Sequence, residues 1–326
     1  MAAYALRRAV GHVLLLALAA SLCHLLAAAC LRPRAEFEAR SPRPPQRVID
    51  AELTRLGLND DRPLIARYAH WAAGVVRGDF GRTVDDRPVG AELGRRGMVS
   101  LRLLLPGAVS GAVIGVLLGG RGAIWRHRLG DRLSTVAAIA VLATPAFVLA
   151  IVLQTGAQWI NMAAGSPIFA YVGEYAPGET GGPLAGLGDR LRHLLLPTLT
   201  TALGQIALYS RYQRTLLLDE LRAGHVRAAH ARGVRPRTAL RKYALRPTLV
   251  PVAIYVAYQA GPLLTGMTLT EKVFGWHGMG EWLVDSIARG DVNAVAAIGC
   301  CAAVLVFTAR LLADVLAAAI DPRVRR

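Results

Sequence analysis

At residues 227–233 the chain reads Arg227-Ala228-Ala229-His230-Ala231-Arg232-Gly233, at the centre of a basic segment that separates two long apolar stretches. This segment, residues 211–246, holds ten lysine and arginine residues against two acidic ones. Between membrane spans, a loop of such charge is retained in the cytoplasm. The paired alanines, with a glycine four residues after the second, predict a small-sided helix that ends in a sharp turn. The pattern indicates a docking surface and not a catalytic one.

The composition predicts a membrane protein. Of 326 residues, 54% are hydrophobic and only 18% are charged, whereas about 25% of residues are charged in typical soluble domains. The net charge of +16 would suit a nucleic-acid partner. The cytoplasmic loops of a membrane protein account for the arginines equally well, so no nucleic acid is expected. The four cysteines lie in or beside apolar stretches and are expected to be packing residues.

Six apolar stretches are long enough to cross a bilayer, namely residues 9–31, 99–120, 133–155, 193–209, 248–270 and 292–320. Arginine-rich loops alternate with loops that are acidic or long, which places both chain ends in the cytoplasm. The sequence therefore predicts an all-α integral membrane protein with six transmembrane helices. Pro145 is expected to kink the third of them.

This topology divides the chain into four parts. Residues 1–31 are expected to form an N-terminal transmembrane helix. A cleaved signal peptide is the alternative, although the apolar length favours an uncleaved helix. Residues 32–98 are expected to form an extracellular insert of short amphipathic helices. Residues 99–320 would be the core, with the basic segment as its cytoplasmic loop, and residues 321–326 a cytoplasmic tail.

No catalytic or metal-binding pattern stands out. The chain lacks the Gly-x4-Gly-Lys-Ser/Thr loop that cradles nucleotide phosphates. His225 and His230 are five residues apart, a spacing that does not place two metal ligands on one helix face. The third and fifth apolar stretches contain no charged residue or histidine, whereas ion-coupled carriers place such residues at mid-membrane depth. Any transport is therefore expected to draw its energy from outside this chain.

The basic segment resembles the cytoplasmic coupling loop of binding-protein-dependent ABC importers, whose permeases carry a Glu-Ala-Ala-x3-Gly pattern. This chain has Ala228, Ala229 and Gly233 in that pattern but Arg227 in place of the glutamate. This departure, and Arg246 where a proline is common, look like the peptide branch of the family.

Other stretches extend the resemblance over most of the chain. Residues 77–81 look like the family's motif before the second span, and residues 271–280 are similar to its outer loop between the last two spans. The resemblance is to the B-type permease of an oligopeptide or dipeptide importer. It marks as structural motif residues Gly78, Asp79, Gly81, Glu271, Phe274, Gly278, Gly280, Asp314, Asp321 and Pro322. It marks as ATPase-coupling residues Arg227, Ala228, Ala229, Arg232, Gly233 and Arg237.

The resemblance implies the type-1 permease fold of ABC importers and a heteromeric assembly. This chain would pair with a homologous second permease, two ATPase subunits that bind ATP and Mg, and an extracellular solute-binding protein that delivers peptide. ATP would close the ATPase pair and move the helix around Ala228 and Ala229 as a rigid lever, with Gly233 setting its turn. Neither a catalytic residue nor a cofactor is expected in this chain, and its substrate-binding residues are left unassigned.

Three alternatives stay open beside this interpretation. The same architecture could carry nickel, glutathione or an opine. The chain could instead be an ATP-independent carrier or channel, which would function without an ATPase partner. A membrane-embedded enzyme is disfavoured because polar groups are scarce in the apolar stretches.

Overall fold

The computed structural model describes residues 2–176 and 182–320, and their regular structure is helical apart from one isolated β-bridge between Arg82 and Pro88. The helices in chain order are α1 (Ala2–Cys30), α2 (Pro33–Glu38), α3 (Gln46–Arg55), α4 (Leu64–Val76), α5 (Val89–Ile124), α6 (Leu129–Ala143), α7 (Ala146–Ala164), α8 (Gly182–Leu221), α9 (Gly224–Ala231), α10 (Pro236–Thr238), the π-helical η1 (Ala239–Leu245), α11 (Arg246–Tyr258), α12 (Ala260–Phe274), α13 (Met279–Ala288) and α14 (Val292–Ile320). The predicted all-α class is confirmed.

Within the described part of the chain, four helices are long and apolar enough to cross a membrane. They are Ala9–Cys30 of α1, the whole of α5, the whole of α7 and Val292–Val315 of α14. A fifth span results if the segment Pro236–Tyr258 and α12 are taken together, with a bend of 46° between them. The six spans and the cytoplasmic position of both ends stay predictions.

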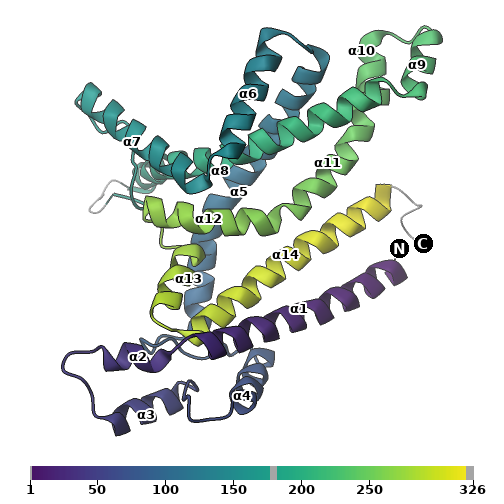
Figure 1. Ribbon diagram of the computed structural model, residues 1–326. Helices are drawn as coiled ribbons and strands as arrows, with labels where there is room; N and C mark the ends of the chain where they lie inside the picture. The colour runs from purple at the N-terminus through teal and green to yellow at the C-terminus, as the bar shows by residue number, and fades with distance from the viewer. Residues whose placement is uncertain (1, 177–181, 321–326) are drawn as a thin grey trace. The chain divides into compact units, whose positions relative to one another are not determined.

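The predicted third span, residues 133–155, is two helices and not one kinked helix. Helix α6 ends at Ala143, and Thr144 and Pro145 are extended, with ψ of 126° and 142°. The cause is local, because the proline ring disfavours helical geometry in the residue before it. Helix α7 therefore leaves at a steep angle to α6 (Figure 1).

Two helices extend well beyond the predicted membrane spans. Helix α5 begins at Val89 and has 36 residues, so the last ten residues assigned to the insert, 89–98, form its first turns. Helix α8 has 40 residues. It takes up the whole predicted fourth span, residues 193–209, together with the end of the outer loop and the start of the basic segment.

The described residues divide into two compact units, which we describe separately. One contains residues 2–100 and 277–311, and the other contains residues 101–176, 182–276 and 312–320. Helix α5 and helix α14 each contribute to both.

In the first unit, the insert packs around the ends of α1 and α14. Apolar side chains of the insert form a cluster with Ala27 and Ala28 of α1 and Val292 of α14. The insert residues in this cluster are Phe37, Ile49, Leu53, Leu56, Leu58 and Val84. The amphipathic character predicted for the insert is confirmed in α3, which buries Ile49 and Leu53.

Hydrogen bonds from two residues at the start of α14 anchor the insert. The Asp291 carboxylate accepts the backbone N–H of Val84 at 3.0 Å, and the Asn293 amide donates to the carbonyls of Leu56 and Arg82 at 3.1 and 2.9 Å. The insert is therefore fixed to the core of its unit by polar contacts as well as apolar ones.

In the second unit, α5 and α8 approach closely along a stripe of glycines. A Cβ added at Gly107, Gly111 or Gly115 would lie 2.8, 2.5 and 2.9 Å from the Cβ of Thr201, Gln205 and Tyr209. The four-residue spacing places these glycines on one face of α5. Small residues at such positions let membrane helices pack backbone to backbone.

Candidate functional site

The centre of the basic segment forms a short helix with a defined end. Helix α9 spans Gly224–Ala231, and Gly233 follows it in the left-handed conformation with φ of 79°. The N–H of Gly233 donates to the His230 carbonyl at 2.9 Å, and the N–H of Val234 donates to the Ala229 carbonyl at 3.1 Å. This pair of bonds is a Schellman motif, for which glycine is the favoured residue. The predicted sharp turn at Gly233 is confirmed.

Of the residues assigned to ATPase coupling, five lie on the surface of the unit and one does not. The exposed ones are Arg227, Ala228, Arg232, Gly233 and Arg237. Ala229 is only 6% exposed. Ala229 therefore lies on the same inward face of α9 as Val226, because the two are three residues apart.

The inward face of α9 belongs to a small apolar cluster. Val226 packs with Ala123 of α5, Leu217 of α8 and Ala244 of η1, all of them buried. On the polar side, Nε2 of His225 lies 3.0 Å from both a Glu220 carboxylate oxygen and the Tyr243 carbonyl. Helix α9 is thus held against the ends of α8 and η1, where Figure 1 shows it beside α10.

An ion pair that the sequence analysis missed ties α8 to α6. The Arg214 guanidinium donates to both carboxylate oxygens of Asp131, at 2.7 and 2.9 Å. The same carboxylate accepts the backbone N–H of His127 at 3.0 Å. Hydrogen bonding from Arg214 holds the pKa of Asp131 below its usual range and raises that of Arg214. In the sequence, this ion pair is indicated only by Asp131, a lone acid in an arginine-rich loop. Its partner lies 83 residues further along the chain.

A second buried contact links α8 to α11. Gln213 is fully buried, and its amide donates to the Thr248 hydroxyl at 2.9 Å. Together with the Asp131–Arg214 pair, it joins the start of the basic segment to α11 and to α6. Both contacts are directional and connect α8 to α6 and to α11.

The structural motif residues of the first unit occupy turns and a helix start. Gly78 and Gly81 have φ of 81° and 80°, and the Asp79 carboxylate accepts the N–H of Gly81 at 2.9 Å. Gly278 is the N-cap of α13, and Gly280 lies in its first turn. Left-handed backbone favours glycine because other side chains are strained there.

In the second unit, the motif residues are buried or lie near a helix end. Glu271 and Phe274 are each 1% exposed, and the Glu271 carbonyl accepts the N–H of Trp276 at 2.9 Å. The Tyr258 hydroxyl lies 3.5 Å from the Asp314 carboxylate. Asp321 and Pro322 lie outside the described residues. Within each unit, the described motif residues thus serve separate turns and contacts.

The chain is similar to membrane components of import systems. Residues 111–326 match the family described as binding-protein-dependent transport system inner membrane component. Over 325 residues the chain is 50% identical to the oligopeptide transport system permease protein OppB of Mycobacterium bovis and of Mycobacterium tuberculosis, which covers 100% of this chain and 99% of each relative. Over 279 residues it is 32% identical to the glutathione transport system permease protein GsiC of Escherichia coli, 84% of either chain.

The family match covers more than half of the chain, and the likeness to OppB extends over nearly its whole length. The described segments that the match includes are α6 to α14 and the C-terminal part of α5, residues 111–124, with the basic segment and its Gly233 turn among them. The chain belongs to the family of binding-protein-dependent transport system inner membrane components.

Proposed function

We propose that this chain is the permease subunit of an ATP-driven importer that moves peptides across the cytoplasmic membrane. The observation that carries the proposal is the 50% identity, over the full chain, to a permease of an oligopeptide transport system. The four apolar helices and the bent fifth segment supply the membrane-embedded part. Helix α8, which includes residues 193–209, would be the sixth span.

The partners in this proposal are a homologous second permease, two ATPase subunits that hold ATP and Mg, and an extracellular solute-binding protein. The exposed face of α9 would meet the ATPases. Arg227 on α9, Arg232 at the C-cap of α9 and Arg237 in α10 are exposed and suit carboxylates on a partner. Ala228 lies exposed next to Arg227 and permits a close approach of the partner's backbone.

The proposed coupling mechanism depends on the contacts that hold α9 in place. When ATP closes the ATPase pair, α9 would move as a rigid lever, because its Schellman end and its apolar underside resist bending. The Asp131–Arg214 pair and the Gln213–Thr248 contact would carry this motion into α6, α8 and α11. Two arrangements of these helices would then expose the pathway to one side of the membrane at a time.

The test is co-purification of the tagged chain from its native membrane after mild detergent extraction, followed by an ATPase assay and peptide uptake in proteoliposomes. Recovery of a second permease and ATPase subunits, with hydrolysis raised by a peptide-loaded binding protein, is expected. A chain that purifies alone and still moves solute without ATP would contradict the proposal and favour a carrier or channel.

Glutathione is a second candidate cargo because of the likeness to GsiC. The identity of 32% over 84% of the chain is lower than the likeness to OppB, so an oligopeptide is the preferred substrate. A competition assay distinguishes the two cargoes: uptake of labelled oligopeptide is measured with and without excess unlabelled glutathione, in the presence of the matching binding protein. Glutathione should lower this uptake only if it is itself a transported substrate.

A further inference from the structure

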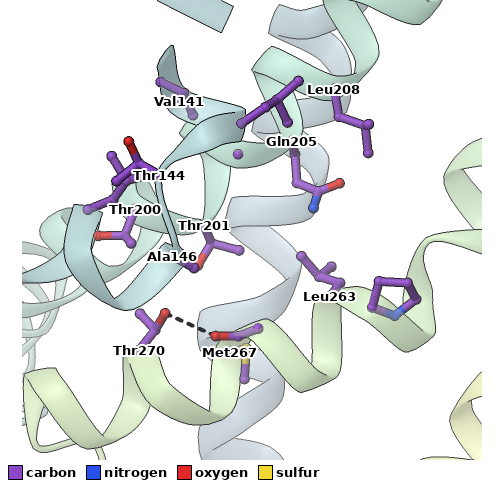
Figure 2. A pocket seen from close by; sticks show the side chains of 15 residues that line it. Val141, Thr144, Ala146, Thr200, Thr201, Gln205, Leu208, Leu263, Met267 and Thr270 are labelled. Carbon is purple, nitrogen blue, oxygen red and sulfur yellow. Dashed lines mark hydrogen bonds between the residues drawn. The ribbon is translucent and has the colours of Figure 1, made fainter. Parts of the chain in front are cut away.

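A pocket of about 230 Å³ lies in the second unit, where two helix breaks face the middle of α8. Its walls come from the α6–α7 break, from one face of α8 and from one face of α12, between Pro262 and Thr270. Figure 2 shows the Gln205 side chain extending from α8 into this space, opposite Leu263 of α12. The pocket is separate from the coupling segment.

The pocket exists because the chain departs from continuous helix and because two wall positions are glycine. Thr144, at the break before Pro145, lines it, and α12 starts after the bend at Gln259. Non-helical backbone at membrane depth is tolerated where it is covered by protein or lines a cavity. A Cβ added at Gly204 or Gly266 would meet nothing within 4 Å, so the open space continues up to both backbones.

The polar groups of the pocket are mainly hydrogen-bond acceptors. Each of its threonines donates its hydroxyl proton to a carbonyl of its own helix, at distances between 2.8 and 3.3 Å; they are Thr144, Thr200, Thr201 and Thr270. A hydroxyl has one proton and two lone pairs, so the oxygens keep acceptor capacity. In addition, the buried side-chain carbonyl oxygen of Gln205 has no hydrogen-bond partner among the described residues. The nitrogen of the same amide is a donor, so acceptors outnumber donors among the side chains of the pocket.

The uncharged lining of the pocket restricts the chemical groups that it can bind. All the residues that line the pocket in the described part of the chain are uncharged. A peptide's termini and charged side chains would be unpaired here, and burying an unpaired charge is strongly unfavourable. The N–H groups of a peptide main chain are uncharged donors that match the acceptors, and they recur in peptides of any sequence.

We propose that this pocket binds main-chain N–H groups of the peptide in transit, through the Gln205 carbonyl and the threonine hydroxyls. Its 230 Å³ is smaller than the roughly 300–1,000 Å³ of pockets for drug-sized ligands, so it receives a portion of the peptide and not the whole molecule. The inference rests on the proposed peptide import and adds the place and chemistry of contact.

The first test fills the pocket. Leucine at Gly204 or Gly266 would occupy the open space without meeting this chain's own atoms at Cβ, and Gly156→Leu in α7 is the matched control because its Cβ also meets nothing and it lies outside the pocket. In the reconstituted complex with its binding protein, Gly204→Leu and Gly266→Leu are expected to lower peptide uptake by roughly tenfold or more. Gly156→Leu should keep wild-type uptake, and co-purification of the partners checks that each variant assembles.

The second test measures whether hydrogen bonds to the pocket contribute to uptake, and it does not depend on filling the volume of the pocket. Gln205→Leu and Thr201→Val remove hydrogen-bonding atoms at nearly constant shape. The probes are one labelled peptide and the same peptide N-methylated at its central amides, delivered by the same saturating binding protein. Wild type is expected to prefer the unmodified peptide, and the double variant should lose much of this preference through slower uptake of the unmodified probe. A preference for the unmodified peptide that is the same in the double variant and in wild type would overturn the inference, because the pocket would then not bind the amide N–H groups.

The two levels of the proposal fail differently. If the wild-type complex imports no peptide, the proposed function fails and the pocket assignment fails with it. If the wild type imports peptide and both leucine variants import it equally fast, only the pocket assignment is overturned.

Discussion

A Cβ added to Gly111 of α5 would lie 2.5 Å from the Cβ of Gln205 in α8, closer than such carbons approach in folded proteins. Gly111 therefore allows Gln205 to sit where its amide reaches the pocket (Figure 2). The same helix contact continues at Gly119, whose added Cβ would collide with the Ser210 carbonyl. The glycine stripe of α5 thus determines how α8 is placed, and with it one wall of the pocket.

Gly111→Ala is expected to destabilise the protein, because the new methyl group must push α5 and α8 apart. Overpacking of this kind costs about 1–3 kcal/mol. Gly120→Ala, on the same helix, is the control, since its Cβ meets nothing within 4 Å. It should be neutral or stabilising by up to about 1 kcal/mol, through helix propensity. Thermal unfolding of both variants in one detergent measures the difference, and equal melting temperatures would contradict the packing argument.

Asp131→Asn is expected to lower stability at neutral pH by roughly 1–3 kcal/mol, because the Arg214 guanidinium loses its ionic partner in a largely buried site. The exposed Asp219 offers a matched control in Asp219→Asn, which should behave as wild type. Thermal unfolding at pH 7 separates the two variants.

The same pair predicts a pH dependence. The pKa of Asp131 is lowered in the folded state, so the unfolded chain binds the proton more tightly. The stabilisation is therefore complete above the unfolded-state pKa of about 3.9 and is lost as the pH falls through the lower folded-state pKa. Melting curves between neutral pH and pH 3 should show wild type losing its advantage over Asp131→Asn in the acid range. A constant difference would contradict the ionic role of the pair.

Ala228→Glu and Ala229→Glu test the two faces of α9. Ala228 is exposed, so its variant should keep the stability of the chain but lose ATPase subunits on co-purification, because a negative charge is added to the proposed contact. Ala229 is buried, so its variant should also lower the melting temperature, because an unpaired carboxylate enters the α9 underside. If Ala228→Glu co-purifies with the ATPases and imports peptide as wild type does, the coupling assignment is wrong.

Gly233→Ala should loosen the end of α9, because an alanine in left-handed backbone is strained by about 1–2 kcal/mol. Gly224→Ala is its control, as this glycine starts α9 without a positive φ and its Cβ would meet nothing. Faster amide hydrogen exchange in residues 224–234 of Gly233→Ala, relative to the control, is expected. Equal protection in both variants would show that the Schellman end is not needed.

Asn293→Leu should release the insert, because it leaves the carbonyls of Leu56 and Arg82 without their donor. Asn59→Leu removes only local bonds, one donated to the Thr54 hydroxyl and one accepted from the Asp61 N–H, and serves as the control. Limited proteolysis is expected to cut the insert of Asn293→Leu faster than that of the control. An unchanged rate would mean that the apolar cluster alone holds the insert.

The sequence alone was enough to predict the local features of this protein. Apolar stretches and amphipathic spacing predicted helices, and the helix-ending role of Gly233 followed from its place after the paired alanines. These features depend on neighbours within a few residues, which is why they can be read without tertiary structure. The motif glycines Gly78 and Gly81 are of the same kind, since a positive φ is a property of the local backbone.

Contacts between distant segments could not be predicted in this way. The partner of Asp131 lies 83 residues further on, and the inward orientation of Ala229 depends on where α8 and η1 lie. Pro145 predicted a disturbance, but whether it would kink a helix or separate two helices depended on what the freed residues pack against.

Sequence by itself therefore determined that the chain is helical and apolar, that its basic segment carries a capped helix, and which family it belongs to. Tertiary structure alone decided which alanine of that helix is exposed, which residues hold the helix in place and where a pocket opens. The physical reason is the distance along the chain over which each kind of interaction acts. Helix formation and turns are governed by interactions within a few residues of the chain, whereas burial and cavities arise only when segments far apart in sequence are packed together.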